Sequence, residues 1–289
     1  MYKIKMSGGL GNQLFCYAFY LRMKLQFPSE KVVIDYNNYK YCKFHNGLRM
    51  TQVFGVNYPF DIKLHYSLVE RVIYKIHDLI ENGIYKLKKN LVVHEDINEF
   101  NNFMKDSFHK KTVLFNGTWG SELYFKPAKE RVLQEFSNYK VNISDSSLKI
   151  SENMLKEESV FIHVRRGDYL KTDFVDLSST SYYKDALEYV KNNVSQSLHI
   201  YVISDDPSYC KSHFDFLKGE NVTYVVGNQD YEDLYLMTKC KYAIIANSSF
   251  SWWGAYLSGA KIICAPKSRL RNKEDRPFEV LYPKEWHLI

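Results

Sequence analysis

The 289-residue chain has no long hydrophobic run, and no apolar stretch approaches the roughly 18 residues that a membrane-spanning helix needs. Its beginning, MYKIKMSGG, is interrupted too early by lysine and glycine to form the apolar core of a secretory signal peptide. We therefore expect a cytoplasmic protein. Short basic patches such as residues 86–89 leave open a peripheral association with the inner face of the membrane.

Paired cysteines and metal-ligand spacings are also missing. The five cysteines lie far apart, mostly within apolar runs, and no Cys-x-x-Cys or Cys/His ligand spacing occurs. We therefore expect buried thiols, a reducing compartment and no bound metal.

A dense basic arm is the third absence. The formal net charge is +6, from 39 Lys and Arg against 33 Asp and Glu, and these residues are spread along the chain. Such a mild excess favours anionic ligands and argues against a nucleic-acid partner. Hydrophobic residues make up 45% of the chain, which is enough for a buried core, and the length favours two domains.

Hydrophobic periodicity predicts a βαβ unit at the start of the chain, with glycines at 8, 9 and 11 in its first turn. The polar stretch 138–147 is the predicted linker, and the domain boundary placed near it gives domains of 1–150 and 151–289. The predicted elements of the first domain are strands at 2–6, 31–36 and 112–117, and helices at 12–27, at 67–87 and up to about residue 136.

The second half has a clearer pattern, in which short apolar runs alternate with helical segments. This alternation predicts a parallel sheet with crossover helices, and hence an α/β fold. The predicted strands are 159–164, 198–204, 222–226, 242–247 and 261–266, and the predicted helices are 181–193, 207–217, 231–240 and 249–258.

Ligands of open parallel sheets bind outside the carboxyl ends of the strands, so the residues that follow each strand are the candidate site. HVRRGD (163–168) follows the first of these strands. Two adjacent arginines, Arg165 and Arg166, need an anion to compensate their desolvation, and guanidinium groups match phosphate oxygens. We predict a pyrophosphate site here. An ion pair with Asp168 or another carboxylate is the alternative.

NSSFSWWGAYLS follows the strand at 242–247. Ser248 or Ser249 can cap the next helix, whose free amides favour negative charge, so this helix start would complete a diphosphate pocket. Plain capping is the alternative. Ser204-Asp205-Asp206 follows another strand and leaves three interpretations open: recognition of a nucleoside, capping of the next helix, and a metal site.

The N-terminal glycines match the dinucleotide fingerprint GxGxxG only in part, because the third glycine is absent and Leu14 stands in its place. Asp35 lies near the position of a ribose-binding acid, which keeps an NAD-dependent dehydrogenase as an alternative. Asn12 and Gln13 are neutral amides that can hydrogen-bond sugar hydroxyls. For Asn12, a helix cap is the alternative.

Five motifs occur in order along the chain: GGLGNQLFCYAF, GTWGSELYF, HVRRGDY, ISDD and NSSFSWWGAYLS. In this order and spacing they resemble the bacterial α-1,2-fucosyltransferases of glycosyltransferase family 11. The resemblance runs from Ser7 to about Trp286, and HxRRxD together with SSFSWW is its specific part. Cys16 and Gly120 depart from the family pattern, since bacterial relatives often carry glutamine at both positions.

The resemblance implies a GT-B-type fold with two Rossmann-like domains facing across a cleft, the first binding the acceptor and the second the GDP-sugar donor. It implies an inverting, metal-independent transfer of L-fucose from GDP-β-L-fucose to the 2-hydroxyl of a galactose-containing oligosaccharide. GDP-fucose is then a substrate, and no cofactor is needed. Assembly of O-antigen or capsule is the pathway that the family suggests.

The resemblance also implies roles for single residues. Arg165 would be the leading contact to the diphosphate and Arg166 a supporting one, while His163 and Asp205 would lie on the nucleoside side. Phosphate and sugar would be contacted by Ser248, Ser249 and Phe250.

Catalysis by inversion needs a general base near the acceptor hydroxyl, or a donor so activated that the proton leaves late. His163 and Asp168 have suitable chemistry, but a histidine beside two arginines is biased towards neutrality and Asp168 can pair with an arginine. We expect Arg165 to stabilise the departing GDP and Asn12 to orient the reacting sugar, with Asp168 as the third catalytic candidate.

Three other functions stay open at this point. Another nucleotide-sugar transferase could use the same scaffold, and a dehydrogenase could use the N-terminal βαβ unit. A lectin-like module is suggested by the 16% of aromatic residues, although the paired arginines argue against it.

Overall fold

A computed structural model describes residues 1–36, 39, 46–56, 76, 91–105, 112–270 and 277–289. The basic patch at 86–89, Cys42 and all but residue 76 of the helix predicted at 67–87 lie outside these ranges. The chain divides into two compact units, Met1–Val141 and Asn142–Ile289. Among the described residues, no helix is both long and apolar enough to cross a membrane.

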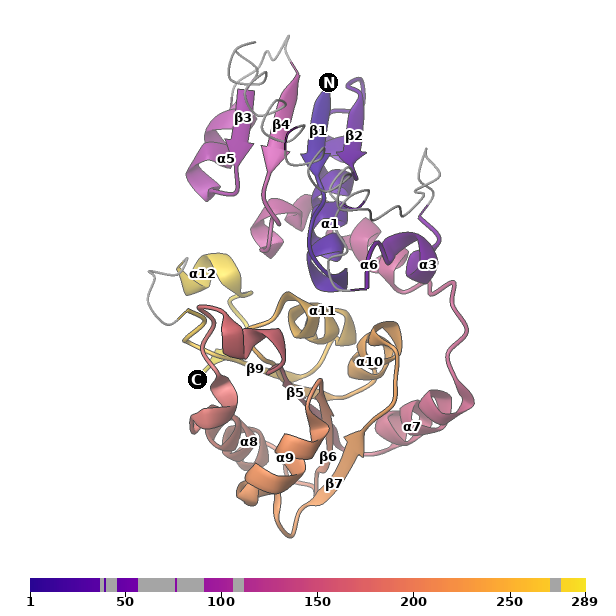
Figure 1. The fold of residues 1–289 in the computed structure, drawn as a ribbon, viewed down its shortest axis with the longest axis vertical. Helices are drawn as coiled ribbons and strands as arrows, with labels where there is room; N and C mark the ends of the chain where they lie inside the picture. The colour runs from indigo at the N-terminus through magenta and orange to yellow at the C-terminus, as the bar shows by residue number, and fades with distance from the viewer. Residues whose placement is uncertain (37–38, 40–45, 57–75, 77–90, 106–111, 271–276) are drawn as a thin grey trace. The chain divides into compact units, whose positions relative to one another are not determined.

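The first unit is built on a parallel sheet with strand order β2-β1-β4-β3 (Figure 1). Strand β3 was not predicted, because its four residues interrupt a Lys- and Asn-rich stretch of weak periodicity. In chain order, the helices and strands are β1 (Tyr2–Lys5), α1 (Leu10–Gln26), β2 (Val32–Asp35), α3 (Met50–Phe54), β3 (Leu91–His94), α5 (Ile97–Lys105), β4 (Val113–Asn116) and α6 (Lys129–Phe136).

Aromatic packing forms the core of this unit. Phe19 on α1 is fully buried and stacks on Trp119, with ring centroids 4.1 Å apart, and Phe115 of β4 contacts both rings edge-on. Aromatic pairs of this kind add about 0.5–1.5 kcal/mol each to the effect of area burial. The core therefore fixes α1 against the end of β4, which is where the first two motifs meet.

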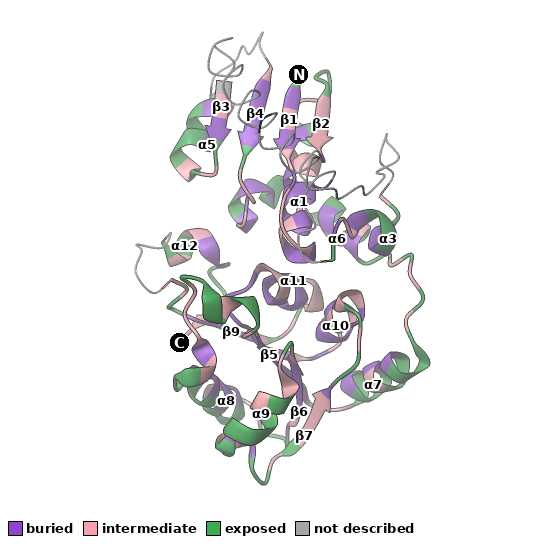
Figure 2. Cartoon of the chain, viewed as in Figure 1, coloured by how far each residue is buried: buried purple, intermediate pink, exposed green. Residues whose placement is uncertain are grey.

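The second unit has a parallel sheet with strand order β10-β9-β8-β5-β6-β7, and β5 is buried throughout (Figure 2). The five predicted strands are confirmed. Among the described elements of this unit, the two-residue β10 and the helices α7 and α12 were not predicted. Its elements are α7 (Asp145–Lys156), β5 (Ser159–Val164), α8 (Tyr182–Asn192), β6 (His199–Ser204), α9 (Pro207–His213), β7 (Asn221–Val225), α10 (Asp230–Met237), β8 (Tyr242–Ile244), α11 (Ser249–Ser258), β9 (Ile262–Ala265), α12 (Phe278–Leu281) and β10 (His287–Leu288).

The division between the two units falls after Val141, inside the predicted linker 138–147, whereas the predicted boundary after residue 150 lies nine residues later. Residue 150 lies inside α7, and the second part of the stretch 138–147 is the first turn of that helix. Ser144 caps it, since its Oγ accepts a hydrogen bond from Ser147 N at 3.3 Å. The Ser- and Asp-rich end of this stretch is therefore a helix start, and the residues before it connect the two units. The division of tasks between the two domains stays a prediction.

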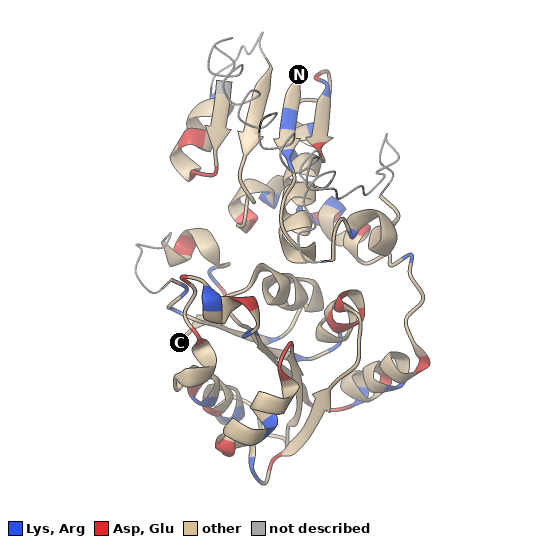
Figure 3. Ribbon diagram, in the orientation of Figure 1, with Lys and Arg blue, Asp and Glu red and all other residues tan. Residues whose placement is uncertain are grey.

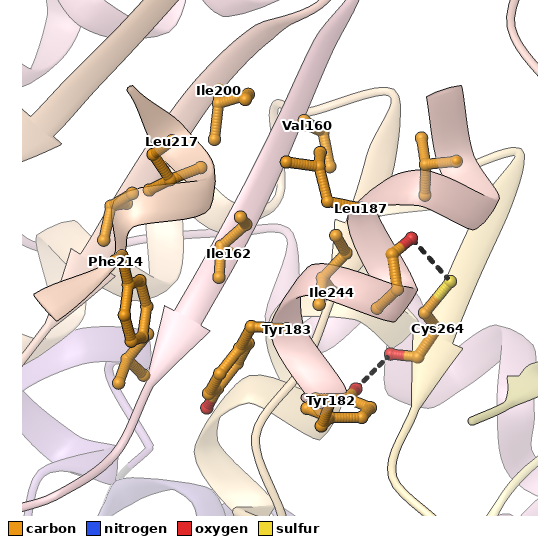
Figure 4. Close-up of a cluster of buried hydrophobic side chains, with 14 of the residues drawn as sticks. Val160, Ile162, Tyr182, Tyr183, Leu187, Ile200, Phe214, Leu217, Ile244 and Cys264 are labelled. Atoms are coloured by element: carbon orange, nitrogen blue, oxygen red, sulfur yellow. Dashed lines mark hydrogen bonds between the residues drawn. The ribbon is translucent and has the colours of Figure 1, made fainter. Parts of the chain in front are cut away.

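Side chains alternate along β5, and this alternation decides which of them point away from the core cluster against α8 and towards α11. Val160 and Ile162 point into a cluster with Tyr183 and Leu187 of α8 (Figure 4). Because successive side chains of a strand point to opposite faces, His163 points to the other face. Its ring there lies 5.6 Å from the ring of Phe250 on α11.

Acidic residues gather in the first turn of α10 (Figure 3). Glu232 accepts hydrogen bonds from Gln229 N at 3.1 Å and from Ser144 N at 3.0 Å, so it joins this turn to the start of α7. Carboxylates are favoured near the positive end of the helix dipole. Asp233 nevertheless has its pKa raised to about 7, first by burial and then by the charges of Asp230 and Glu232.

Stability is therefore expected to depend on pH through Asp233. A raised folded-state pKa means that the folded chain binds more protons than the unfolded chain between pH 4 and 7, so the free energy of unfolding falls as pH rises through this window. For the half-buried Asp233 we expect a fall of about 2 kcal/mol. Urea unfolding at pH 4.5 and pH 8 should show a smaller difference in Asp233→Asn than in the natural protein, and equal differences would contradict this.

Candidate active site

Three loops meet at the carboxyl edge of the second sheet. They follow β5, β6 and β8, which lie side by side in the order β8-β5-β6. These loops hold the predicted donor-site residues of all three motifs, HVRRGD, SDD and NSSFS. The sheet topology therefore brings together side chains that lie more than eighty residues apart in the chain.

Arg165 is held by carboxylates of two loops. Its Nη2 lies 2.7 Å from Asp168 Oδ1, and its Nη1 lies 3.2 Å from Asp205 Oδ2. The side chain keeps 28% of its surface exposed. Its guanidinium also lies 5.8 Å from the ring centre of Tyr169. Arg165 is thus oriented in advance but still accessible to an anion.

The side chain of Arg166 is less exposed than that of Arg165. Its Nη1 pairs with Asp176 Oδ2 at 3.1 Å and its Nε with Asp206 Oδ2 at 3.4 Å, and its side chain is 12% exposed. The guanidinium carbon lies 3.3 Å from the ring centre of Tyr209. These contacts give Arg166 a mainly structural position and correspond to the ion-pair alternative. The supporting contact to a diphosphate that was expected of Arg166 stays a prediction. Asp176 and Tyr209 were not predicted, because nothing in their local sequence marks them as partners of an arginine.

The two neighbouring aspartates of the second loop have different tasks. Asp206 caps α9 by accepting from Tyr209 N at 3.0 Å, so the capping interpretation is correct for this residue. Asp205 accepts from Arg166 N at 2.9 Å and pairs with Arg165. A Cβ on Gly167 would come within 2.7 Å of Asp205 Oδ2, so glycine lets the two loops approach closely.

To bind a metal ion, Asp205 and Asp206 would need at least one further ligand. Across the described ranges, no group of three or more His, Cys, Asp or Glu side chains is placed to hold a metal ion. Metal independence itself stays a prediction.

His163 is a neutral imidazole in the folded protein. It is 4% exposed, and its pKa is lowered to about 3 by burial and, to a smaller degree, by the positive charge of Arg165. Within the described part of the chain its Nδ1 has no hydrogen-bond partner. A neutral histidine carries one donor and one acceptor nitrogen, so it can hydrogen-bond a polar ligand. It brings no positive charge to the site.

The start of α11 completes this edge. Ser248 caps the helix, as predicted, by accepting from Phe250 N at 3.3 Å, and Ser249 is the first helical residue. Asn247 anchors the turn by donating to the backbone oxygens of Val175 and Arg269 at 3.0 and 3.2 Å. The first amides of a helix and its dipole favour an anion. The plain-capping alternative is therefore realised at Ser248, and a diphosphate at this position stays a prediction.

Tyr169 joins two of these loops and was not assigned from the sequence. Its hydroxyl donates to Asn247 O at 3.4 Å, and its ring stacks on Phe174 with centroids 4.2 Å apart. The tyrosine directly follows HVRRGD, which is the one sequence signal that could have identified it.

The N-terminal motif differs from its prediction at Gly11 and at Gln13, and the alternative of a helix cap at Asn12 is not realised. Helix α1 begins at Leu10 after Gly9, so Gly11 lies inside the helix, and Asn12 is not its cap. Gln13 is fully buried: its Nε2 donates to Gly47 O at 2.8 Å and its Oε1 accepts from Arg49 N at 2.8 Å. The expectation that Gln13 faces the sugar is therefore wrong. Asn12 is half-buried.

The backbone conformation of the turn before α1 requires glycine at position 8. Gly8 has φ +80°, and a Cβ at this position would collide with the Asn12 side chain. Asp35, the residue on which the dehydrogenase alternative depends, pairs with Lys3 at 2.8 Å and is thereby bound within the sheet. This contact argues against a ribose-binding task for Asp35.

Comparison with known proteins agrees with these observations. The family model "Glycosyl transferase family 11" matches residues 1–289. An alpha-1,2-colitosyltransferase of Escherichia coli is 30% identical over 297 residues, which cover 98% of this chain and 96% of that protein. The O-antigen biosynthesis glycosyltransferase WbnK of Escherichia coli is 29% identical over 290 residues, covering 91% of this chain and 92% of WbnK.

A solved structure also shares the fold. The NodZ alpha-1,6-fucosyltransferase soaked with GDP-fucose matches with a TM-score of 0.56 and 15% identity, over 91% of this chain and 93% of that one. At this identity the likeness shows the fold alone, and the predicted GT-B-type α/β class is confirmed. With the family model matched from the first residue to the last, the chain is a glycosyltransferase and belongs to glycosyl transferase family 11.

Proposed function

We propose that the chain transfers L-fucose from GDP-β-L-fucose to the 2-hydroxyl of a galactoside and forms an α-1,2 linkage with inversion. The observation that carries the proposal is Arg165, which is oriented by Asp168 and Asp205 and still accessible. It follows β5, which pairs with β8, and β8 leads into the start of α11. A guanidinium fork and free helix amides together suit a diphosphate leaving group.

Donor binding follows from this arrangement. Arg165 binds the diphosphate oxygens, and the amides at Ser248 and Ser249 contact them from α11. His163 and Asp205 contact the nucleoside, where the neutral imidazole hydrogen-bonds without adding charge. Phe250 is half-buried beside His163 and packs against the sugar.

Transfer proceeds by attack of the acceptor oxygen on the anomeric carbon. The bond from this carbon to the diphosphate breaks, and Arg165 and α11 stabilise the negative charge that develops on GDP. Asn12 orients the reacting sugar. Asp168 already contacts Arg165 through Nη2 and Nε, so we assign it to holding that guanidinium. The acceptor proton leaves late, as the glycosidic bond forms, and is taken up by the departing diphosphate.

The acceptor that we propose is a galactose-containing oligosaccharide of the O-antigen kind. Support comes from the motif resemblance and from WbnK, whose name assigns it to O-antigen biosynthesis. A colitosyl donor is the second candidate, because a relative at 30% identity is an alpha-1,2-colitosyltransferase. Colitose is fucose without its 3-hydroxyl group, so both sugars fit one reaction scheme.

A donor panel tests this proposal. GDP-fucose, GDP-colitose, GDP-mannose and UDP-galactose are each supplied with a β-galactoside, with and without EDTA, and the product linkage is determined by NMR. We expect an α-1,2-linked fucoside whose rate is unaffected by EDTA. Transfer only from GDP-colitose would replace the donor. Transfer only from GDP-mannose or UDP-galactose, or loss of the rate in EDTA, would overturn the proposal.

A further inference from the structure

Glu95, at the end of β3, contacts a loop that the proposed mechanism does not yet use. One carboxylate oxygen, Oε2, accepts from Thr118 N at 2.7 Å and from Thr118 Oγ1 at 2.8 Å. The other, Oε1, accepts from Gly120 N at 2.7 Å. Hydrogen bonds to a charged acceptor are about twice as strong as those between neutral groups. A single carboxylate therefore holds both sides of the loop 117–120.

The residue between these two contacts has an unusual backbone conformation. Trp119 has φ 58°, in the left-handed region that residues other than glycine rarely occupy. Its side chain is fully buried on Phe19. Glu95 binds the residues on either side of Trp119, and the buried indole of Trp119 packs on Phe19. These contacts fix the loop in one conformation.

The loop lies next to the part of α1 that carries Asn12. Strands β1 and β4 are paired, with Ile4 opposite Phe115, so the segments that follow them leave the sheet side by side. Cys16 Sγ on α1 lies 3.7 Å from the carbonyl oxygens of both Gly117 and Thr118. Asn12 lies one helical turn before Cys16 on the same side of α1. The loop 117–120 and Asn12 thus share one edge of the first unit.

From this geometry we propose that Glu95 is a positioning residue for the acceptor sugar: it fixes the loop 117–120 beside Asn12 as part of the acceptor site. This inference rests on the proposed function, in which the first unit binds the acceptor. Both oxygens of Glu95 accept hydrogen bonds from the loop, so we assign this carboxylate to positioning the loop.

Glu95→Gln tests the inference, because it retains the shape of the side chain but replaces one acceptor oxygen by a donor. Glu99→Gln is the matched control, since Glu99 Oε2 accepts from His94 N at 2.7 Å near the same strand end. In Glu95→Gln we expect kcat/KM for the acceptor to fall about 10- to 100-fold, with GDP affinity and donor hydrolysis unchanged. Glu99→Gln should leave all of these values unchanged.

Gly117→Ala is an independent second variant. A Cβ on Gly117 would overlap Cβ of Glu95, so the glutamate must move although its carboxylate is intact. The same loss in acceptor kcat/KM is expected. Unchanged acceptor kinetics in Glu95→Gln, or a parallel loss of GDP affinity in a variant with the natural melting temperature, would overturn the positioning role.

Hydrogen exchange separates this inference from the proposed function. We expect faster exchange in residues 116–121 of Glu95→Gln than in Glu99→Gln, with no change in the second unit. If the natural protein transfers sugar from no donor, the proposed function fails, and exchange still decides whether Glu95 holds the loop. Equal exchange in the two variants would overturn the inference whatever the activity.

Discussion

Replacing Arg165 with alanine is expected to lower kcat/KM for the donor by about two orders of magnitude or more, on the scale of losing one preorganised transition-state donor. The substitution removes the accessible guanidinium and leaves Asp168 and Asp205 without their shared cation. Steady-state kinetics with GDP-fucose and calorimetry with GDP measure the effect. Arg165→Lys should retain only part of the activity, because it keeps the charge but loses the planar fork.

Lys191→Ala is the matched control for Arg165→Ala. Lys191 pairs with Glu220 at 2.6 Å in the same unit, away from the three loops, and exposed ion pairs contribute little to stability. Its kinetics should be unchanged. A folded Arg165→Ala variant with near-normal turnover would remove Arg165 from the mechanism.

Replacing Gln13 with leucine is expected to lower the free energy of unfolding by about 3 kcal/mol, because several buried backbone groups lose their partner at once. Gln13 joins the glycine turn to the segment 47–50, through Gly8 O, Gly47 O and the amides of Arg49 and Met50. Leucine preserves the volume but none of these hydrogen bonds. Thermal and urea unfolding measure the loss.

Asn12→Ala is the contrasting variant, one residue earlier on the same helix. Asn12 is half-buried, so we expect a stability change below about 1 kcal/mol and a fall in turnover that exceeds any loss of GDP affinity. Loss of turnover in Gln13→Leu at an unchanged melting temperature would show instead that Gln13 faces the substrate.

The donor side could be predicted well from the sequence because its residues follow predictable strands. Buried strands such as 159–164 are clear apolar runs, and in a parallel sheet their carboxyl ends share one edge. HVRRGD, SDD and NSSFS were therefore expected together, and the contacts of Arg165 with Asp168 and Asp205 agree with this. The roles of these residues in binding and catalysis stay predictions.

The division of labour within each motif could not be predicted in this way. Arg165 and Arg166 are identical residue types, yet Tyr209 and Asp176 bury Arg166. Tyr209 comes from α9 and Asp176 from a later part of the loop after β5, so both lie outside the motif. Asn12 and Gln13 are both amides. Gln13 is buried because it hydrogen-bonds the segment 47–50, whereas Asn12 is the candidate sugar contact. Glu95 showed no signal at all, because its three hydrogen bonds reach residues more than twenty positions away.

The sequence by itself determined the alternation of strands and helices, the two-unit organisation and the family, because periodicity and motif order are local and linear properties. The tertiary structure alone decided which charged and amide side chains are buried and paired within the protein and which stay accessible. That difference depends on burial and on hydrogen-bond partners from distant segments. Local sequence contains neither, since a side chain loses its water only when the remaining chain has folded around it.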